Sequence, residues 1–195
     1  GRTLSNGKAG SSTVVEEAIS QTVKACGDMS ESRTGALILF ERSVNVTTLL
    51  KSRGTVINSD VTAELLKNIF YNKAPLHDGA LIIRNFRIAE AGCVLPLTER
   101  ANLSADLGTR HRAGIGLSEN SDAVVVIVSE ETGAISVAMD GKLKRHLTPE
   151  ALNELLHKEL IQPDDGGEKH NYLKNIKNFF MSDLKEEDKQ DEKAI

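Results

Sequence analysis

The sequence contains few aromatic residues: five Phe, two Tyr and no Trp among 195 residues. Proteins that bind single-stranded nucleic acid stack the bases on aromatic side chains, and sites for organic cations are lined by aromatic rings. Positive charge is not in excess either, because 24 Lys and Arg stand against 28 Asp and Glu, for a formal net charge of −4. We therefore expect no nucleic-acid partner, and any anion site must be local.

Long hydrophobic runs and cysteines are also scarce. The longest strictly apolar run covers residues 123–128, whereas about 20 apolar residues are needed to span a bilayer. The two cysteines, Cys26 and Cys93, are too few for a disulfide framework or a four-ligand zinc site. These absences indicate a soluble stretch of chain in a reducing compartment, with Cys93 as a small core residue.

The length of the chain fits one domain with polar ends. Residues 1–12 are polar and rich in Gly and Ser, which is typical of a linker or of a remnant left by cloning. Residues 161–195 are predicted to be a polar, charged C-terminal tail, and its stretch 182–193 (SDLKEEDKQDEK) is mostly charged. The sequence therefore predicts a single domain over residues 13–160.

The order of apolar and polar residues predicts helices interleaved with strands. The first helix is expected to begin at a capping box formed by Thr13 and Glu16. Other helices are expected from a cap at Asp60 to Phe70, within 104–117 after a loop, and from Thr148 to about Leu160; strands are expected at 35–40, 80–84, 87–95, 123–129, 134–139 and 142–147, with turns at Asn85 and 140–141. This arrangement predicts an α/β fold in which α-helices flank a mixed β-sheet.

Three short segments concentrate ionisable residues and glycine at predicted strand or helix ends, where α/β folds bind ligands. The first is 76–80 (LHDGA), in which Asp78 precedes a buried strand and Gly79 lets a substrate approach the backbone. An Asp-Gly pair by itself favours an ordinary turn. His77 beside Asp78 supplies a second potential metal ligand, which raises the chance of a site.

The second segment is 108–112 (GTRHR), which is expected to open a helix. Free N–H groups at a helix start favour phosphate, and arginine binds phosphate oxygens in a two-pronged manner that lysine cannot reproduce. The alternative is a solvated basic turn that pairs with the nearby acids Asp106 and Glu119. Because the protein as a whole is acidic, we favour phosphate binding slightly.

The third segment is 129–133 (SEETG), after the most apolar strand. Glu130 and Glu131 are candidate oxygen ligands for Mg²⁺ or Mn²⁺. On an extended chain they point opposite ways, so only one can face a site unless the chain turns there. The alternative is a charged hairpin turn. We find neither a Walker lysine loop nor a Rossmann glycine pattern, and His146, His157 and His170 lie in polar stretches without ligand-like partners.

Taken together, LHDGALII at 76–83, LGTRHRAGIGLSE at 107–119 and VIVSEETGAISVA at 126–138 resemble the diadenylate cyclase (DAC) domain. The resemblance runs from about Thr13 to Leu160 and is greatest to the membrane-anchored CdaA type. It implies the DAC-domain fold, a mixed sheet flanked by helices. It also implies that two ATP molecules are condensed to cyclic di-AMP, with release of two pyrophosphates, in the presence of Mn²⁺, Mg²⁺ or Co²⁺.

The resemblance also assigns roles to residues of this sequence. Asp78 is implied to help activate the ribose 3′-hydroxyl, and Leu95 to lie by the adenine. Relatives often carry an aromatic residue where this sequence has Val94. The implied catalytic residues are Asp78, Arg110 and His111; the implied ATP-binding residues are Gly79, Ala80, Leu95, Gly108, Thr109, Arg110, His111, Arg112, Ser129 and Glu130; and the implied metal ligands are Asp78, Glu130, His77 and Glu131.

The resemblance extends to partners and location. A reaction that joins two ATP molecules symmetrically, with one copy of each motif per chain, predicts two subunits face to face. The family further implies inhibition by phosphoglucosamine mutase and control by a membrane-bound regulator. It places the full-length protein at the cytoplasmic face of the cell membrane, so we expect this chain to be a truncated, soluble piece. Two alternatives stay open: a non-catalytic module that binds adenine nucleotide, and, less favoured, a metal phosphohydrolase.

Overall fold

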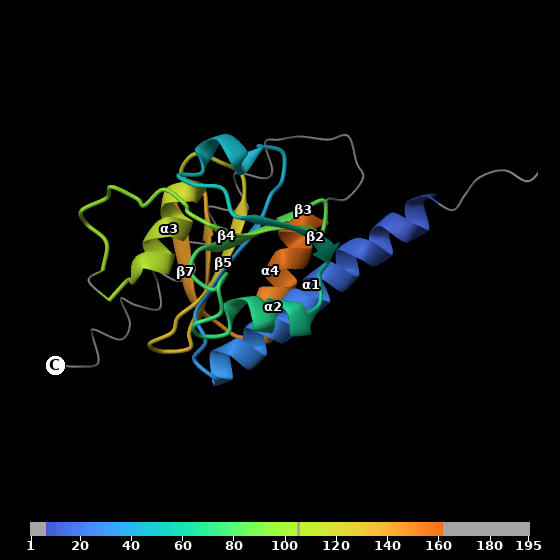
Figure 1. Cartoon of the computed structure of the whole chain (residues 1–195), viewed down its shortest axis with the longest axis horizontal. Coiled ribbons are helices and arrows are strands. Elements are labelled where there is room, and N and C mark those ends of the chain that lie inside the picture. Colours follow the sequence, from blue (N-terminus) through green and yellow to red (C-terminus); the bar gives the residue numbers. More distant parts are fainter. Residues whose placement is uncertain (1–6, 105, 162–195) are drawn as a thin grey trace, which may run out of the picture. The chain divides into compact units, whose positions relative to one another are not determined.

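The computed structural model describes residues 7–104 and 106–161. Helices are interleaved with single strands and with groups of two or three strands along this part of the chain (Figure 1). Their order is α1 (Gly7–Glu31), β1 (Ala36–Phe40), the 3-10 helix η1 (Val46–Leu49), β2 (Thr55–Asp60), α2 (Ala63–Phe70), β3 (Ala80–Arg84), β4 (Arg87–Cys93), α3 (Thr109–Ser118), β5 (Val124–Val128), β6 (Ile135–Met139), β7 (Lys142–Leu147) and α4 (Pro149–Leu160).

The seven strands form one sheet in the order β2-β4-β3-β1-β5-β6-β7. β1 and β3 are parallel, and the other neighbouring strands are antiparallel. The predicted mixed sheet is therefore confirmed. β1 and β5 are buried along their whole length because they are central and covered on both faces, which explains their continuous apolar sequences.

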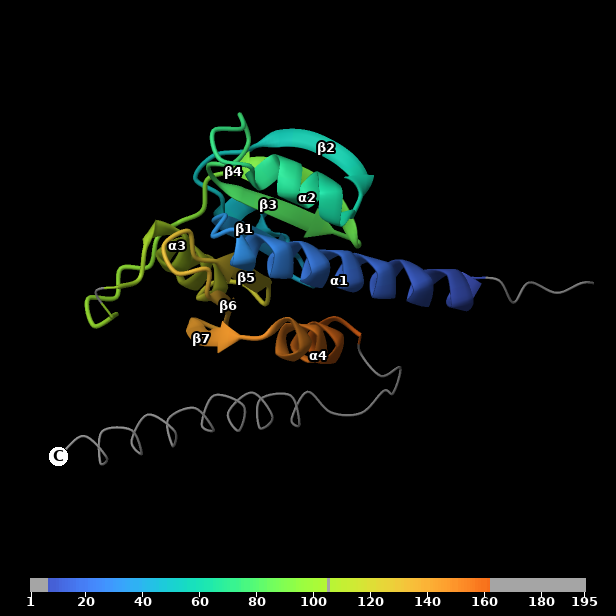
Figure 2. The same cartoon turned by 90° about the horizontal axis from the view of Figure 1, so that it is seen from below.

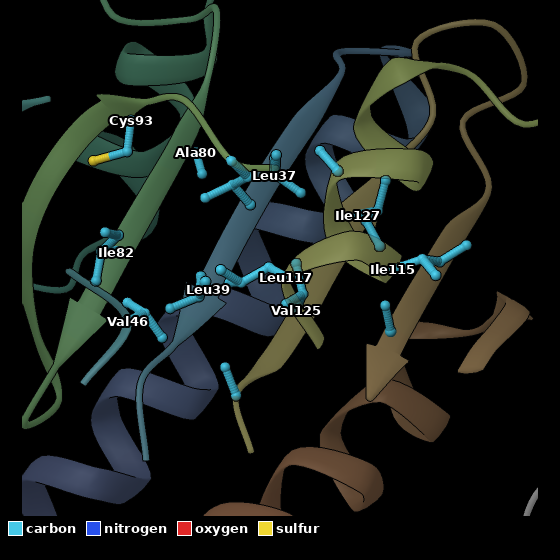
Figure 3. Packing of buried hydrophobic residues seen from close by; sticks show 14 of the residues in the cluster. Leu37, Leu39, Val46, Ala80, Ile82, Cys93, Ile115, Leu117, Val125 and Ile127 are labelled. Carbon is cyan, nitrogen blue, oxygen red and sulfur yellow. The ribbon is translucent and has the colours of Figure 1, made fainter. Parts of the chain in front are cut away.

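The helices cover the two faces of the sheet unequally. α3 lies against one face, whereas α1, α2 and α4 lie on the other (Figures 1 and 2). The side chains between α3 and the sheet form a buried apolar cluster, in which Leu37, Val125 and Ile127 meet Ile115 and Leu117 of the helix (Figure 3). This cluster holds the start of α3 near the end of β5.

Two predicted hairpin turns are confirmed by their backbone angles. Asn85 and Phe86 both have positive φ, at 50° and 58°, and so do Asp140 and Gly141, at 48° and 70°. Consecutive residues with positive φ form a tight turn that matches the twist of the two strands.

Two helix starts differ from the prediction. α1 begins at Gly7, so the predicted capping box at Thr13 lies inside the helix and is wrong. No proline interrupts 7–12, and extending an existing helix is easier than starting one. α2 is capped by Thr62, whose hydroxyl accepts from the Leu65 N–H, whereas Asp60 ends strand β2.

Strand β2 is absent from the sequence prediction because it is an exposed edge strand without a buried stripe. The helix within 104–117 and the Thr148 cap of the last helix are confirmed. Residues 1–6 of the predicted linker and 162–195 of the predicted tail lie outside the described residues. The domain limits at 13 and 160 stay predictions.

Candidate functional site

The sheet register brings the first and third segments to one end of the sheet. In the parallel pair, Ile38 of β1 lies beside Leu81 of β3, so both strands start at the same end. In the antiparallel pair, Ala36 lies beside Val128, so β5 ends there. Neighbouring strands are about 4.8 Å apart, and the backbones at the start of β3 and the end of β5 are therefore about 10 Å apart, with β1 between them.

The second segment joins them through the start of α3. Gly108 is the N-cap and has no side chain to cap the helix. The first N–H groups of the helix therefore receive no side-chain capping bond from the N-cap residue. A pocket of about 510 Å³, open solvent at its mouth included, lies between this helix start and the end of β5. Its lining consists of Asp106, Gly108, Thr109, Arg110, His111, Val128, Ser129, Glu130 and Glu131.

An ion pair links the helix start to the strand end. Arg110 Nη1 lies 2.9 Å from Glu130 Oε2, and the arginine is mostly buried while the glutamate is exposed. Gly35, just before β1, lies beneath this pair: a Cβ there would come within 2.6 Å of Arg110 Nη1 and 3.1 Å of Glu130 Cβ. Gly35 is thus a site residue that sequence analysis treated only as part of a strand.

The alternative of a basic turn paired with Asp106 and Glu119 is wrong. Asp106 pairs with Arg145, and Glu119 pairs with Arg100. Arg110 pairs with Glu130 instead, and both residues line the pocket. The helix start is therefore part of a concave site, as the phosphate-binding interpretation requires.

Two buried polar atoms at this helix start have no hydrogen-bond partner: Arg110 Nε and His111 Nε2. Buried polar atoms are normally paired, so two unpaired ones beside a pocket are available to a ligand. Burial lowers the pKa of His111 below its usual value, and the charge of Arg145 lowers it further, against an opposing effect of Asp106. The lowered pKa favours the neutral imidazole of His111.

Both glutamates of the third segment line the pocket, because the chain turns after β5. Ser129 Oγ accepts from the N–H groups of Glu131 and Thr132, at 3.3 and 3.2 Å. A hydroxyl that accepts twice still has its own proton to donate. Ser129 can thus hold the turn and donate to a ligand oxygen at once.

Other predicted site residues do not line this pocket. Asp78 is exposed, at the start of β3, and His77 places Nδ1 2.7 Å from the Ala74 carbonyl oxygen, which leaves Nε2 for another partner. Leu95 is 4% exposed and packs in the apolar cluster of the α3 side. Arg112 donates from Nε to the Leu107 carbonyl at 3.3 Å. Their roles toward ATP stay predictions.

Gly79 is required by the strand beside it. Its φ is +124°, and a Cβ would lie 2.8 Å from the Cys93 carbonyl oxygen of β4. Only glycine adopts this conformation without strain. The close approach in the structure is to the backbone of β4. The approach of a substrate to Gly79 stays a prediction.

Further observations bear on the remaining sequence predictions. Within 7–104 and 106–161, no group of three or more His, Cys, Asp or Glu residues could by itself hold a metal ion. His157, expected to have no ligand-like partner, lies 2.6 Å from Glu16 Oε2 and links α4 to α1; His170 lies outside the described residues. Cys26 and Cys93 are both buried and free, and the burial of Cys93 confirms its prediction as a core residue. In the described part of the chain, no helix combines the length and apolarity needed to cross a membrane.

Comparison with known proteins agrees with these findings. Residues 23–143 match the family described as "DAC: DisA bacterial checkpoint controller nucleotide-binding". The cyclic di-AMP synthase CdaA of Bacillus subtilis is 48% identical over 153 residues, which cover 76% of this chain and 56% of that protein. A diadenylate cyclase of Listeria monocytogenes is 44% identical over 133 residues, 68% of this chain and 48% of that protein.

The fold is also shared with a solved structure. The crystal structure of a double mutant of DacA from Staphylococcus aureus matches with a TM-score of 0.72 and 45% identity, covering 75% of this chain and 97% of that one. The chain spans about half the length of the curated relatives it matches. The family match covers more than half of this chain, and together with the shared mixed sheet it shows that the chain belongs to the DAC family.

Proposed function

We propose that this chain is a diadenylate cyclase, which condenses two ATP molecules to cyclic di-AMP and two pyrophosphates. The observation that carries this proposal is the sheet register, which brings the ends of β1, β3 and β5 together beside the start of α3. The relatives named diadenylate cyclase support the same reaction.

The start of α3 is suited to hold the triphosphate. Its uncapped N–H groups and the mostly buried Arg110 supply positive charge beside the pocket. Arg110 Nε and His111 Nε2 both lack a partner and can donate to phosphate oxygens if His111 carries its proton on Nε2. These donors would stabilise the charge that develops on the departing pyrophosphate.

Asp78 is the group that we assign to the attacking hydroxyl. In the reaction the ribose 3′-oxygen of one ATP bonds to the α-phosphorus of the other, and the bond to the pyrophosphate oxygen breaks. The proton of the hydroxyl passes to Asp78, which acts as the general base. Asp78 is exposed at the start of β3 and can therefore meet a nucleotide from outside.

A divalent cation, Mn²⁺ or Mg²⁺ with Co²⁺ as a further candidate, fits the donors of this site. Such ions prefer oxygen ligands and are commonly held by one or two carboxylates together with substrate phosphates, which agrees with the lack of a preformed cluster in 7–104 and 106–161. Glu130 and Asp78 would hold it, with His77 and Glu131 as further candidates. When bound, the ion would neutralise phosphate charge.

The symmetry of the product leads us to propose a homodimer. The described residues supply one set of site groups, Asp78 and the start of α3. The reaction needs two hydroxyls, each in line behind the other nucleotide's pyrophosphate. Two subunits face to face, each with one ATP, supply both. We propose the membrane location, the phosphoglucosamine mutase contact and the membrane regulator only for a protein of the relatives' full length.

Incubation of the chain with ATP and Mn²⁺, followed by mass spectrometry, tests the activity. We expect cyclic di-AMP, whereas bound but unchanged ATP would mean a nucleotide-binding module, and ADP or AMP with phosphate would mean a hydrolase. Asp78→Asn should abolish the product while ATP still raises the melting temperature. The matched control is Asp60→Asn, which changes an exposed carboxylate at the end of β2 that pairs with Arg87. This variant should stay active.

Dilution tests the dimer. Specific activity at saturating ATP should fall as the enzyme is diluted, and excess Asp78→Asn should suppress wild-type turnover through mixed pairs. Flat activity over a hundredfold dilution without suppression would contradict an exchanging dimer. Sedimentation at the lowest assayed concentration would then distinguish a single active chain from a tight dimer.

A further inference from the structure

We propose that Arg145 of β7 is a positioning residue, which sets the start of α3 against the nucleotide by holding Asp106. The inference rests on the proposed cyclase function. Asp106 lies two residues before the N-cap Gly108 and lines the pocket, whereas Arg145 comes from the far edge of the sheet. No sequence motif singled out Arg145.

The backbone of β7 is irregular at this arginine. Ile135 of β6 pairs with Leu147 and Val137 pairs with Lys144, so Ser136 faces both Arg145 and His146. This is a β-bulge, and His146 within it has a φ of +57°. Bulges redirect side chains and are frequent beside active sites.

The register places Arg145 on the α3 side of the sheet. Leu143, two residues earlier on β7, packs against the apolar cluster of that side. Ser136 pairs with Ile127, another member of the cluster. A Cβ on Gly114 of α3 would lie 2.9 Å from Ile127 Cδ1, so the helix packs directly on this row. Arg145 thus lies on the face that carries the pocket helix.

The contact with Asp106 is direct. Arg145 Nη2 donates to Asp106 Oδ2 at 2.6 Å, and Ser104 Oγ hydrogen-bonds to the other carboxylate oxygen. Asp106 is thereby tied to β7 on one side and to its own loop on the other. Because Leu107 and Gly108 follow immediately, this tie limits where the first turn of α3 can lie.

Two observations indicate that Arg145 serves the site and not only the fold. Its Nε is buried without a partner, like Arg110 Nε and His111 Nε2 at the same helix start. Its charge also lowers the pKa of His111, after the larger effect of burial. Arg145 therefore acts on the loop through Asp106 and on the pocket histidine through its charge.

The test compares Arg145→Met, Arg145→Lys, Asp106→Asn and the double variant Arg145→Met/Asp106→Asn. We expect Arg145→Met and Asp106→Asn each to lower kcat/KM at least about tenfold, and the double variant to be no worse than either, because both break one contact. Arg145→Lys should recover to within about threefold of wild type, since an ammonium still pairs with Asp106. The matched control is Arg87→Met, which breaks another Arg–Asp pair, between β4 and β2 at the opposite edge of the sheet, and should leave kcat/KM unchanged.

A second measurement separates this inference from the proposed function. Calorimetry of α,β-methylene ATP binding reports whether the start of α3 is correctly positioned, whether or not the chain turns over ATP. Weaker binding in Arg145→Met and Asp106→Asn, but not in Arg87→Met, is expected. A chain that makes no cyclic di-AMP but shows this pattern would refute the cyclase alone. Unchanged binding and kinetics in Arg145→Met, or losses that multiply in the double variant, would overturn the positioning role.

Discussion

Arg53, just before β2, and Arg84, at the end of β3, differ from the arginines beside the pocket in how completely they are paired. Arg53 uses both Nε and Nη2 on Glu90, and Arg84 uses both on Glu41, with Thr47 as a further partner. Their acids are almost fully buried. Beside the pocket, Arg110 and Arg145 each leave Nε without a partner, and both pair with carboxylates that are more than half exposed.

This difference separates pairs that hold the fold from pairs that can serve a ligand. A buried carboxylate needs its arginine, because removing one partner leaves an uncompensated charge in a dry place. An exposed carboxylate keeps its hydration and can give up its arginine at small cost. Arg110 can therefore turn from Glu130 toward a phosphate, whereas Arg84 cannot leave Glu41.

The largest effect is expected when an arginine beside the pocket is changed. Arg110→Lys should lower kcat/KM for cyclic di-AMP formation about 100-fold, because a point charge cannot replace a two-pronged contact with phosphate oxygens. The melting temperature without nucleotide should stay within a degree or two of wild type, since Glu130 is exposed. Steady-state assays that find full activity with lysine would mean that Arg110 provides general electrostatics only.

A smaller effect is expected on the structural side. Arg84→Met should lower the free energy of unfolding by about 2 kcal/mol, less than for a fully buried pair because Arg84 is about one-third exposed and Glu41 keeps the Val46 N–H. That corresponds to a fall in Tm of about 5 °C. Activity of the folded enzyme should be kept. The same loss from the exposed pair in Arg87→Met would remove the distinction drawn above.

The smallest effect concerns the titration of one carboxyl. Arg145, and after it Ser104, lower the pKa of Asp106 to about 2. A lowered pKa contributes stability above the ordinary value near 4, and that contribution is lost as the pH falls toward 2. In Arg145→Met, an NMR titration should find the Asp106 pKa raised from about 2 toward 4, but still below 4 because the Ser104 hydrogen bond remains. An unchanged pKa would show that the ion pair does not form in solution.

Much of the fold could be predicted because burial leaves a local pattern. β1 and β5 are continuous apolar runs, and the turns at Asn85 and Asp140 carry residues that tolerate positive φ. β2 could not be predicted in this way, since an edge strand is mostly exposed and its ladder to β4 depends on a distant segment. The start of α1 was missed because a helix can extend through polar residues.

The candidate site divides along the same line. The segments around Asp78, Arg110 and Glu130 are recognisable in the sequence because each combines ionisable residues with glycine at an element end. Gly35 and Arg145 carry no such local signal. Gly35 matters only because the side chains of Arg110 and Glu130 pack against it. Arg145 matters only because the β7 bulge turns its side chain toward α3.

The sequence by itself therefore determined the identity of the chemical groups, the central strands and the helix that presents Arg110, since each depends on neighbours along the chain. The tertiary structure alone decided that strands β1, β3 and β5 bring their ends together, that Arg110 pairs with Glu130 and not with Asp106, and that Arg145 reaches the pocket loop. These contacts join segments far apart in the chain, and sheet register and helix packing, not local pattern, set which of them meet.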